Sequence, residues 1–262
     1  MRPVGPIPPA FTPVAAVLCG RHVQPQPDGG QDLVSTERRA EDIAALVAAL
    51  RLPDQASTGD IACSADLVVP PWLALLDQRD RWLRPSVPTD VCGKPRAEVR
   101  AALDGLRLVT VATRTVREVE SPAAAVAGCA PRWADMVWVE TAARRAMATP
   151  GTARNAPPLR LCVYRVPASE RGGGKPAGDF AYGGQLAQER QAAVLRALAV
   201  TRPVADCATP ASRFAVLRPA DGAAAPHWYV ELDGCRRFLV VSATGPPQLG
   251  QGDAALAELL AR

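Results

Sequence analysis

The sequence has almost no lysine, little histidine and few aromatic residues. Of the 30 Lys and Arg residues, two are lysines and 28 are arginines. Histidine occurs twice, and aromatic residues make up 5% of the 262 residues. The basic residues stand as isolated pairs among acidic ones, without the clustering and aromatic neighbours of a nucleic-acid surface. We therefore expect no nucleic-acid binding, and we attribute the excess of arginine to a high-GC coding bias.

Several other features are absent, and each absence excludes a class of protein. No run of 18 apolar residues occurs, so we expect no membrane-spanning helix. The 26 prolines exclude a long coiled coil. No C-x-x-C motif occurs, and His22 and His227 are the only histidines. The sequence therefore contains no set of four zinc ligands with the usual spacing. The hydrophobic fraction of 48% and the charged fraction of 21% are those of a globular protein.

Six of the seven cysteines form two triplets with nearly equal spacing. The triplets are Cys19, Cys63 and Cys92, and Cys162, Cys207 and Cys235. The gaps are 44 and 29 residues in the first triplet and 45 and 28 in the second. In both, an apolar run, a polar stretch with glycine, a helical pattern and a strand occur in the same order. This agreement predicts an internal duplication.

The cysteines lie at predicted strand ends and loops, where disulfides are common, so we expect an oxidising, extracytoplasmic compartment. Cys63–Cys92 and Cys207–Cys235 are the natural pairs, and closing a loop of that length stabilises a fold by about 3–4 kcal/mol. Cys129 stands outside the triplets and pairs most simply with Cys19, which leaves Cys162 unpaired. Reduced thiols in a core are the alternative.

Turn-forming residues divide the chain into two predicted units. Residues 1–13 are Pro-rich and extended, 14–147 form the first unit, 148–158 a linker and 159–262 the second unit. The expected helices are 38–51, 96–106, 133–147, 187–199 and 253–261, and the expected strands are 66–69, 73–77, 108–113, 159–165, 213–218, 227–232 and 237–242. This pattern predicts an α+β fold of two tandem related units, each a small antiparallel sheet with packed helices.

Each residue that could be interpreted as catalytic also has a structural explanation. The glycine run Arg171–Lys175 lacks the spacing of a phosphate loop, and no G-x-S-x-G occurs. Asp90 and Asp233 each precede a cysteine by two residues, and we expect them to hold turns, although facing carboxylates could do acid–base work. His227 is expected on a strand surface. The tryptophans near the hairpins are expected to pack, and they are Trp72, Trp82 and Trp228.

Three motifs together resemble a known group of proteins. Val87–Pro95, Arg213–Pro219 and Tyr229–Arg237 are similar to segments of uncharacterised secreted or membrane-anchored proteins of actinobacteria. The resemblance runs from Val14 to nearly the end of the chain. It implies a location outside the cytoplasm, in a group that includes forms with an N-terminal anchor, and it implies no activity.

A weaker likeness, in cysteine spacing only, is to subtilisin-inhibitor-like domains of the same bacteria. It implies a reactive loop at Ser64–Pro70 or at Ala208–Arg213. We expect a non-enzymatic extracytoplasmic binding or structural domain, without catalytic residues, metal or cofactor, whose partner is a protein or another ligand of the cell envelope. The alternatives are a protease inhibitor and an enzyme with its site between the units, which a polar pocket holding perturbed carboxylates would favour.

Overall fold

The computed structural model describes residues 4–56, 59, 61–66, 68–142, 157–200, 202, 204–222, 226–242 and 245–261. The chain divides into two compact units. Unit 1 comprises residues 1–24 and 32–118, and unit 2 comprises 25–31 and 119–262. The division therefore lies before the predicted linker, and of 148–158 only Pro157 and Pro158 are among the described residues. The reason is that residues 119–142 pack against the sheet of unit 2.

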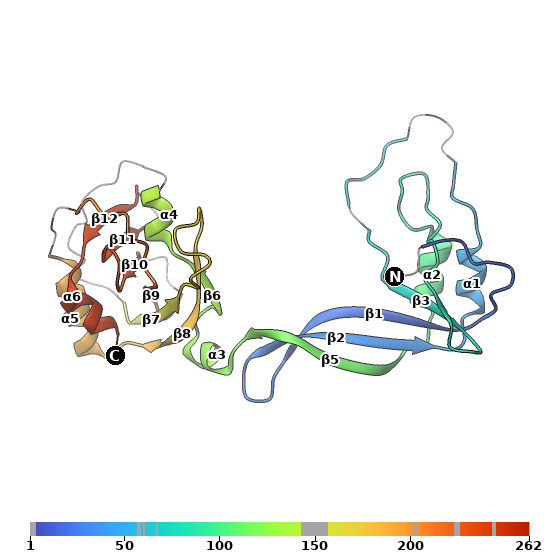
Figure 1. Ribbon diagram of the computed structural model, residues 1–262, viewed down its shortest axis with the longest axis horizontal. Coiled ribbons are helices and arrows are strands. Elements are labelled where there is room, and N and C mark those ends of the chain that lie inside the picture. The colour runs from blue at the N-terminus through green and yellow to red at the C-terminus, as the bar shows by residue number, and fades with distance from the viewer. Residues whose placement is uncertain are drawn as a thin grey trace. The chain divides into compact units, whose positions relative to one another are not determined.

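Unit 1 is a five-stranded sheet with two helices. Its strands are β1 (Pro13–Pro25), β2 (Gln31–Ala40), β3 (Trp72–Asp77), β4 (Trp82–Leu83) and β5 (Val109–Glu120), and its helices are α1 (Ala44–Leu50) and α2 (Ala97–Asp104). The spatial order is β4-β3-β1-β2-β5, with β3 antiparallel to both β1 and β4. Figure 1 shows α1 and α2 side by side beside β3.

The alternation of side chains along β1 and β3 decides which face of this sheet is covered. Ala16 and Leu18 of β1 stand opposite Leu75 and Leu73 of β3, and all four are buried in one cluster with Leu46 of α1. Successive residues of a strand point to opposite faces, so the intervening residues of both strands lie on the other face. Each leucine buried under the helices stabilises the unit by about 1.5–3 kcal/mol.

Unit 2 is a seven-stranded sheet with helices on both faces. Its strands are β6 (Arg132–Ala134), β7 (Leu159–Arg165), β8 (Ala177–Gln185), β9 (Arg213–Pro219), β10 (His227–Glu231), β11 (Arg237–Val241) and β12 (Gln248–Gln251), and its helices are α3 (Pro122–Ala127), α4 (Met136–Ala142), α5 (Gln188–Leu198) and α6 (Ala254–Leu260). The spatial order is β12-β11-β10-β9-β7-β8-β6, and each neighbouring pair is antiparallel.

Two clusters cover the two faces of this sheet. One contains Val194 of α5 and Leu256 of α6, packed with Leu161 and Leu217. The other contains Ala127 of α3 and Val137 of α4, and it is packed with Cys162, Tyr164, Phe214 and Val216. In Figure 1, α5 and α6 lie side by side along one side of the strands. The central strands β7, β9 and β10 are consequently buried on both faces.

The two sheets share part of their topology. The strands β4-β3-β1-β2 of unit 1 and β10-β9-β7-β8 of unit 2 follow the same spatial order. Along the chain, each set reads as two strands, a helix, a cysteine, two strands and a second cysteine, and each ends in a helix that packs on the first. Unit 2 adds the β11–β12 hairpin before that helix. The predicted α+β class with antiparallel sheets describes both units.

Three disulfides link six of the cysteines. Cys63–Cys92 and Cys207–Cys235 form the two pairs expected from the spacing, with Cα–Cα distances of 5.7 Å. The third pair differs from the prediction, since Cys129 is bonded to Cys162 at a Cα–Cα distance of 5.8 Å and Cys19 is free. Helix α3 ends at Ala127 on the sheet of unit 2, which brings the next residues onto β7, whereas Cys19 belongs to the sheet of unit 1.

No helix within the described residues is both long enough and apolar enough to cross a lipid bilayer. The longest of them is α5, with 11 residues. A helix needs about 20 apolar residues to span the hydrocarbon core.

Candidate functional site

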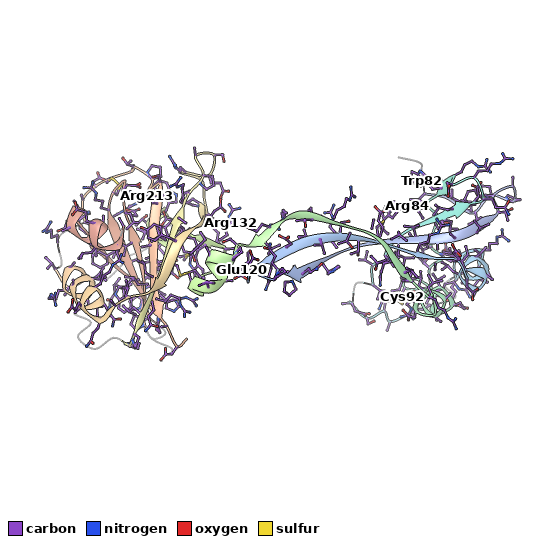
Figure 2. The ribbon with its side chains drawn as sticks, turned by 90° about the horizontal axis from the view of Figure 1, so that it is seen from below. Trp82, Arg84, Cys92, Glu120, Arg132 and Arg213 are labelled. Atoms are coloured by element: carbon purple, nitrogen blue, oxygen red, sulfur yellow. A yellow bond between two sulfur atoms is a disulfide. The ribbon has the colours of Figure 1, made fainter. Side chains whose placement is uncertain are left out.

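The face of the unit 1 sheet that points away from α1 and α2 carries a set of large apolar side chains. We call it the open face, and it consists of Val17, Cys19, Trp72, Leu76 and Trp82 with the small residues between them. The register places Cys19 opposite Trp72, and Leu76 opposite Trp82. Figure 2 shows Trp82 on one side of the strands of unit 1, and the helices with Cys92 on the other.

Two neighbouring tryptophans dominate the open face. The ring centroids of Trp72 and Trp82 are 6.5 Å apart with the planes tilted by 42°. Their exposed fractions are 36% and 37%, while Ala15 and Ala74 on the same face are buried. Large aromatic side chains over small ones form the kind of surface that dominates binding energy in protein interfaces.

A cavity of about 520 Å³ adjoins Trp72 on this face. It is lined by Cys19, Gly20, Arg21, Ser35, Glu37, Trp72 and Arg114. Burial raises the pKa of the Cys19 thiol, and Glu37 raises it further against the opposing effect of Arg114. A thiol with a raised pKa is a poor nucleophile at neutral pH, so this arrangement suits contact with a ligand and not covalent catalysis.

The matching face of unit 2 is closed. Cys162 on β7 occupies the place that Cys19 has on β1, since both point away from the helix pair that follows in the chain. Cys162 and Val216 opposite it are each 1% exposed, under α3 and α4 and beside Cys129. In unit 1 the corresponding pair, Cys19 and Trp72, stays accessible.

Asp90 holds a turn, as predicted, whereas the side chain of Asp233 bonds a distant segment of the chain that precedes β9. The carboxylate of Asp90 accepts hydrogen bonds from the amides of Cys92 and Lys94 at 2.8 and 3.0 Å. Asp233 accepts from the amide and the hydroxyl of Ser212 at 2.6 and 2.5 Å. Burial raises the pKa of Asp233, but these hydrogen bonds outweigh it and leave the pKa below the usual range.

His227 lies half-buried at the start of β10, beside an arginine pair. Burial lowers its pKa, and the charge of Arg218 lowers it further. Arg218 and its cross-strand neighbour Arg160 both donate to the carbonyl of Gly128, the residue that ends α3. Cations at a helix C-terminus stabilise the exposed carbonyl groups, so this pair anchors α3. The surroundings of His227 are therefore structural.

The two segments proposed as reactive loops differ. Described residues of Ser64–Pro70 form no strand, and Val69 is 69% exposed. Lys94 fixes the segment through Ser64 at 2.7 Å and Asp66 at 2.6 Å, and its hydrogen bond lowers the pKa of Asp66 to about 2. Val68, Val69 and Pro70 also line a cavity of about 610 Å³ beside α2.

The segment Ala208–Arg213 is exposed at Ala208 and Thr209 and is held against the fold from Ala211 onwards. Ala211 is 2% exposed, and Ser212 is bound by Asp233. Gly234 fits against this segment with a φ of +62°, and a Cβ there would lie 2.8 Å from the carbonyl oxygen of Thr209. Glycine is the residue that combines this φ with so close an approach.

A cluster of buried charges lies under α4 in unit 2. Arg237 donates from Nε and Nη2 to the two carboxylate oxygens of Glu231, at 3.1 and 2.7 Å. Asp135, 1% exposed, accepts from the amide of Trp138 at 3.2 Å and so caps α4. Burial raises the pKa of Asp135 from 3.8 to about 6, and Glu231 adds to the rise against Arg237. Asp135 lines neither of the two cavities described above.

Replacing Asp135 with Asn is expected to stabilise unit 2 at pH 7. The carboxyl binds its proton more tightly when folded, so its contribution to stability is present below pH 4 and is lost as the pH rises through about 6. Asn keeps the capping oxygen without the charge. Denaturant unfolding at pH 7 should show a gain of about 2–3 kcal/mol, which disappears near pH 4.

The matched control for that variant is Asp253→Asn. Asp253 caps α6 by accepting from the amide of Leu256 at 2.9 Å, and its side chain is 40% exposed. The control should show no comparable gain at pH 7. Equal effects of both substitutions at pH 7 and pH 4 would contradict the assignment of a raised pKa to Asp135.

Sequence reasoning identified the tryptophans only as packing residues, and it did not single out Asp135 or Glu231. A signal for the open face exists in the pattern, because Trp72 and Leu76 alternate with leucines that are buried under helices. Nothing in the sequence shows which face the helices cover. Throughout the described parts of the chain, no three His, Cys, Asp or Glu side chains gather in a way that could hold a metal ion.

Known proteins were compared with the whole chain at three levels. Family models, curated protein sequences and solved structures each yield no match to it.

Proposed function

We propose that this chain is an extracytoplasmic, disulfide-stabilised binding protein that holds a protein partner of the cell envelope on the open face of unit 1. The observation that carries the proposal is the exposed pair Trp72 and Trp82 beside a cavity with charges of both signs. The location follows from the resemblance to secreted actinobacterial proteins, and the three disulfides are compatible with it.

The partner is a protein because of the chemistry of this surface. Tryptophan and arginine are the residues most enriched where interfaces gain their energy, and the open face offers two tryptophans next to Arg21 and Arg114. Glu37, also in the cavity, adds an acceptor for a donor of the partner. The proposed role is recognition without turnover, because Cys19 is protonated at neutral pH, Asp90 is engaged in a turn and Asp233 is engaged by Ser212.

We also infer that the two units descend from one duplicated ancestor. Support comes from the shared strand order and from the paired cysteines at the same points of both units. The equivalent sites of Cys19 and Cys162 agree with it. On this view, unit 2 has covered the ancestral sheet face with α3 and α4, and unit 1 has kept that face for a partner.

The test is affinity capture from the cell envelope with matched variants. The intact chain should recover one stoichiometric protein, and the double variant Trp72→Ala/Trp82→Ala should bind it at least about 30-fold more weakly. Val126→Ala is the control, because Val126 on α3 is 85% exposed and lies in unit 2. Circular dichroism must show that each variant is folded. Equal recovery by all three proteins would refute the proposed site.

Protease inhibition is the second candidate, and one observation favours it. The segment Ser64–Pro70 is exposed, irregular in its described residues and anchored by Cys63–Cys92 and Lys94. A rigidly held exposed segment is what an inhibitor presents to a protease. Titration of subtilisin with the intact chain decides between the two roles. Stoichiometric inhibition that is abolished by Val69→Asp would favour inhibition over the role proposed above.

A further inference from the structure

The four sheet edges of this protein differ sharply in length. Three of them are short, since β4 has two residues, β12 has four and β6 has three. The fourth, β5, has 12 residues and ends the sheet of unit 1. Proteins usually limit free edges by keeping them short, because an unpaired row of backbone groups is a template for another strand. Only β5 departs from that rule here among the described strands.

The first five residues of β5 carry no charge, and its charged residues all lie from Arg114 onwards. It contains neither proline nor lysine and is rich in valine and threonine, which favour strands. Val109, Val111 and Val116 are 66%, 55% and 44% exposed. Such an edge is suited to extending the sheet with a strand from another molecule.

Charges of opposite sign flank Val116 at equal distances along β5. Arg114 precedes it by two residues and Glu118 follows it by two. All three lie on one face of the strand, because side chains alternate. Arg114 is 74% exposed, with a single loose contact of 4.0 Å to Glu37. Its guanidinium is therefore available to a second carboxylate.

We propose that two copies of this chain associate by antiparallel pairing of their β5 strands about Val116. In this register, Arg114 of each copy stands opposite Glu118 of the other, and the two Val116 side chains meet on the two-fold axis. The interface is isologous, with the same residues on both sides. Opposite charges at directly facing positions stabilise strand pairing.

Neighbouring registers are less favourable for physical reasons. In a symmetric antiparallel pair, residues that face each other lie on the same side of the sheet. The two-fold axis must therefore pass through a residue of β5, and each alternative register places the axis at a different residue. Centring the pair on Arg114 places two copies of Arg114 against each other. Centring it on Arg117 pairs Arg114 with Glu120 but places two copies of Arg117 against each other and leaves Glu118 opposite Val116. Centring it on Thr115 forms no charge pair. Only the register about Val116 satisfies both charges, and the pattern of β5 therefore selects it.

Charge reversal followed by restoration tests this inference on the purified chain alone, so it is independent of the envelope partner proposed above. Sedimentation equilibrium should show the intact chain dimerising between low micromolar and near-millimolar concentration. Arg114→Glu and Glu118→Arg each create two like-charge pairs per dimer and should raise the dissociation constant at least about tenfold. The double variant restores both pairs and should return the constant to near its original value. Arg107→Glu, the same charge change outside β5, should leave it within about twofold.

Disulfide cross-linking between introduced cysteines tests the register of the paired strands separately. In a Cys19→Ser background, Val116→Cys should form a disulfide-linked dimer under mild oxidation with diamide, whereas Val109→Cys should not, because position 109 faces no copy of itself. A chain that stays monomeric at near-millimolar concentration would overturn the inference. So would a dimer that tolerates both single reversals, or one in which Val109→Cys links as readily as Val116→Cys.

Discussion

Replacing Glu231 with Gln is expected to lower the free energy of unfolding of unit 2 by about 3–5 kcal/mol. The Glu231 side chain is fully buried and that of Arg237 is 7% exposed. Glu231 also accepts from the Arg237 amide at 2.9 Å. The substitution removes the hydrogen-bonded counterion of the buried guanidinium and leaves only the more distant Asp135 carboxylate to interact with it, which is the costly half of breaking such a pair. Denaturant unfolding followed by tryptophan fluorescence measures the loss.

The double variant Glu231→Gln/Arg237→Met is the control for that experiment. Removing both charges should recover most of the lost stability, since a buried pair replaced by groups of similar volume is close to neutral. A second readout is the pKa of Asp135, which should fall below about 6 once the Glu231 charge is gone. A loss below about 1 kcal/mol in the single variant would show that water reaches Arg237.

Removing the Cys129–Cys162 disulfide is expected to destabilise unit 2 by about 4 kcal/mol. The bond closes a loop of 33 residues, for which the chain-entropy relation gives about this value. Cys129 and Cys162 are 2% and 1% exposed, so the double variant Cys129→Ala/Cys162→Ala also leaves unfilled space in the core beneath α3. Thermal and denaturant unfolding of the variant measure the sum of both effects.

The Cys63–Cys92 disulfide provides the comparison. It closes a loop of 29 residues, nearly the same length, but Cys63 is exposed. Under increasing concentrations of reductant it should open first, and Cys129–Cys162 last, because exchange requires access to the sulfur atoms. Reduction of the buried bond at the lower concentration would show that α3 detaches readily from the sheet.

Elements with strong local signals were predictable from the sequence. Strand β7 and helices α5 and α6 lie within a residue or two of their predicted ranges, because each has one clear periodicity and definite ends. The pairs Cys63–Cys92 and Cys207–Cys235 were also predictable, since each closes a short local loop. Turn-capping by Asp90 follows from the same local chemistry, whereas the contact of Asp233 with Ser212, 21 residues away, does not.

Features that depend on distant contacts were not predictable. Residues 38–40 were expected in a helix and belong to β2, and the described residues of 66–69 form no strand. The expected helix at 133–147 begins only at Met136, because residues 132–134 pair with β8 as strand β6. Cys129 was assigned to Cys19 because the sequence does not show that α3 folds onto β7. The open face was not predicted for the same reason, since the sequence does not show which face of the sheet the helices cover.

The protonated state of Cys19 bears on how long the three native disulfides survive. A free thiol in a disulfide-bonded chain can catalyse its own scrambling, because its thiolate attacks any disulfide sulfur that it reaches. Burial and the Glu37 carboxylate keep that thiolate scarce at neutral pH. In the folded chain Cys19 lies on the open face, away from the side on which Cys92 lies, so the disulfides that it can attack are those of another copy of the chain. Alkaline storage raises the thiolate fraction, and we expect disulfide exchange between copies to begin there without any change in the redox conditions.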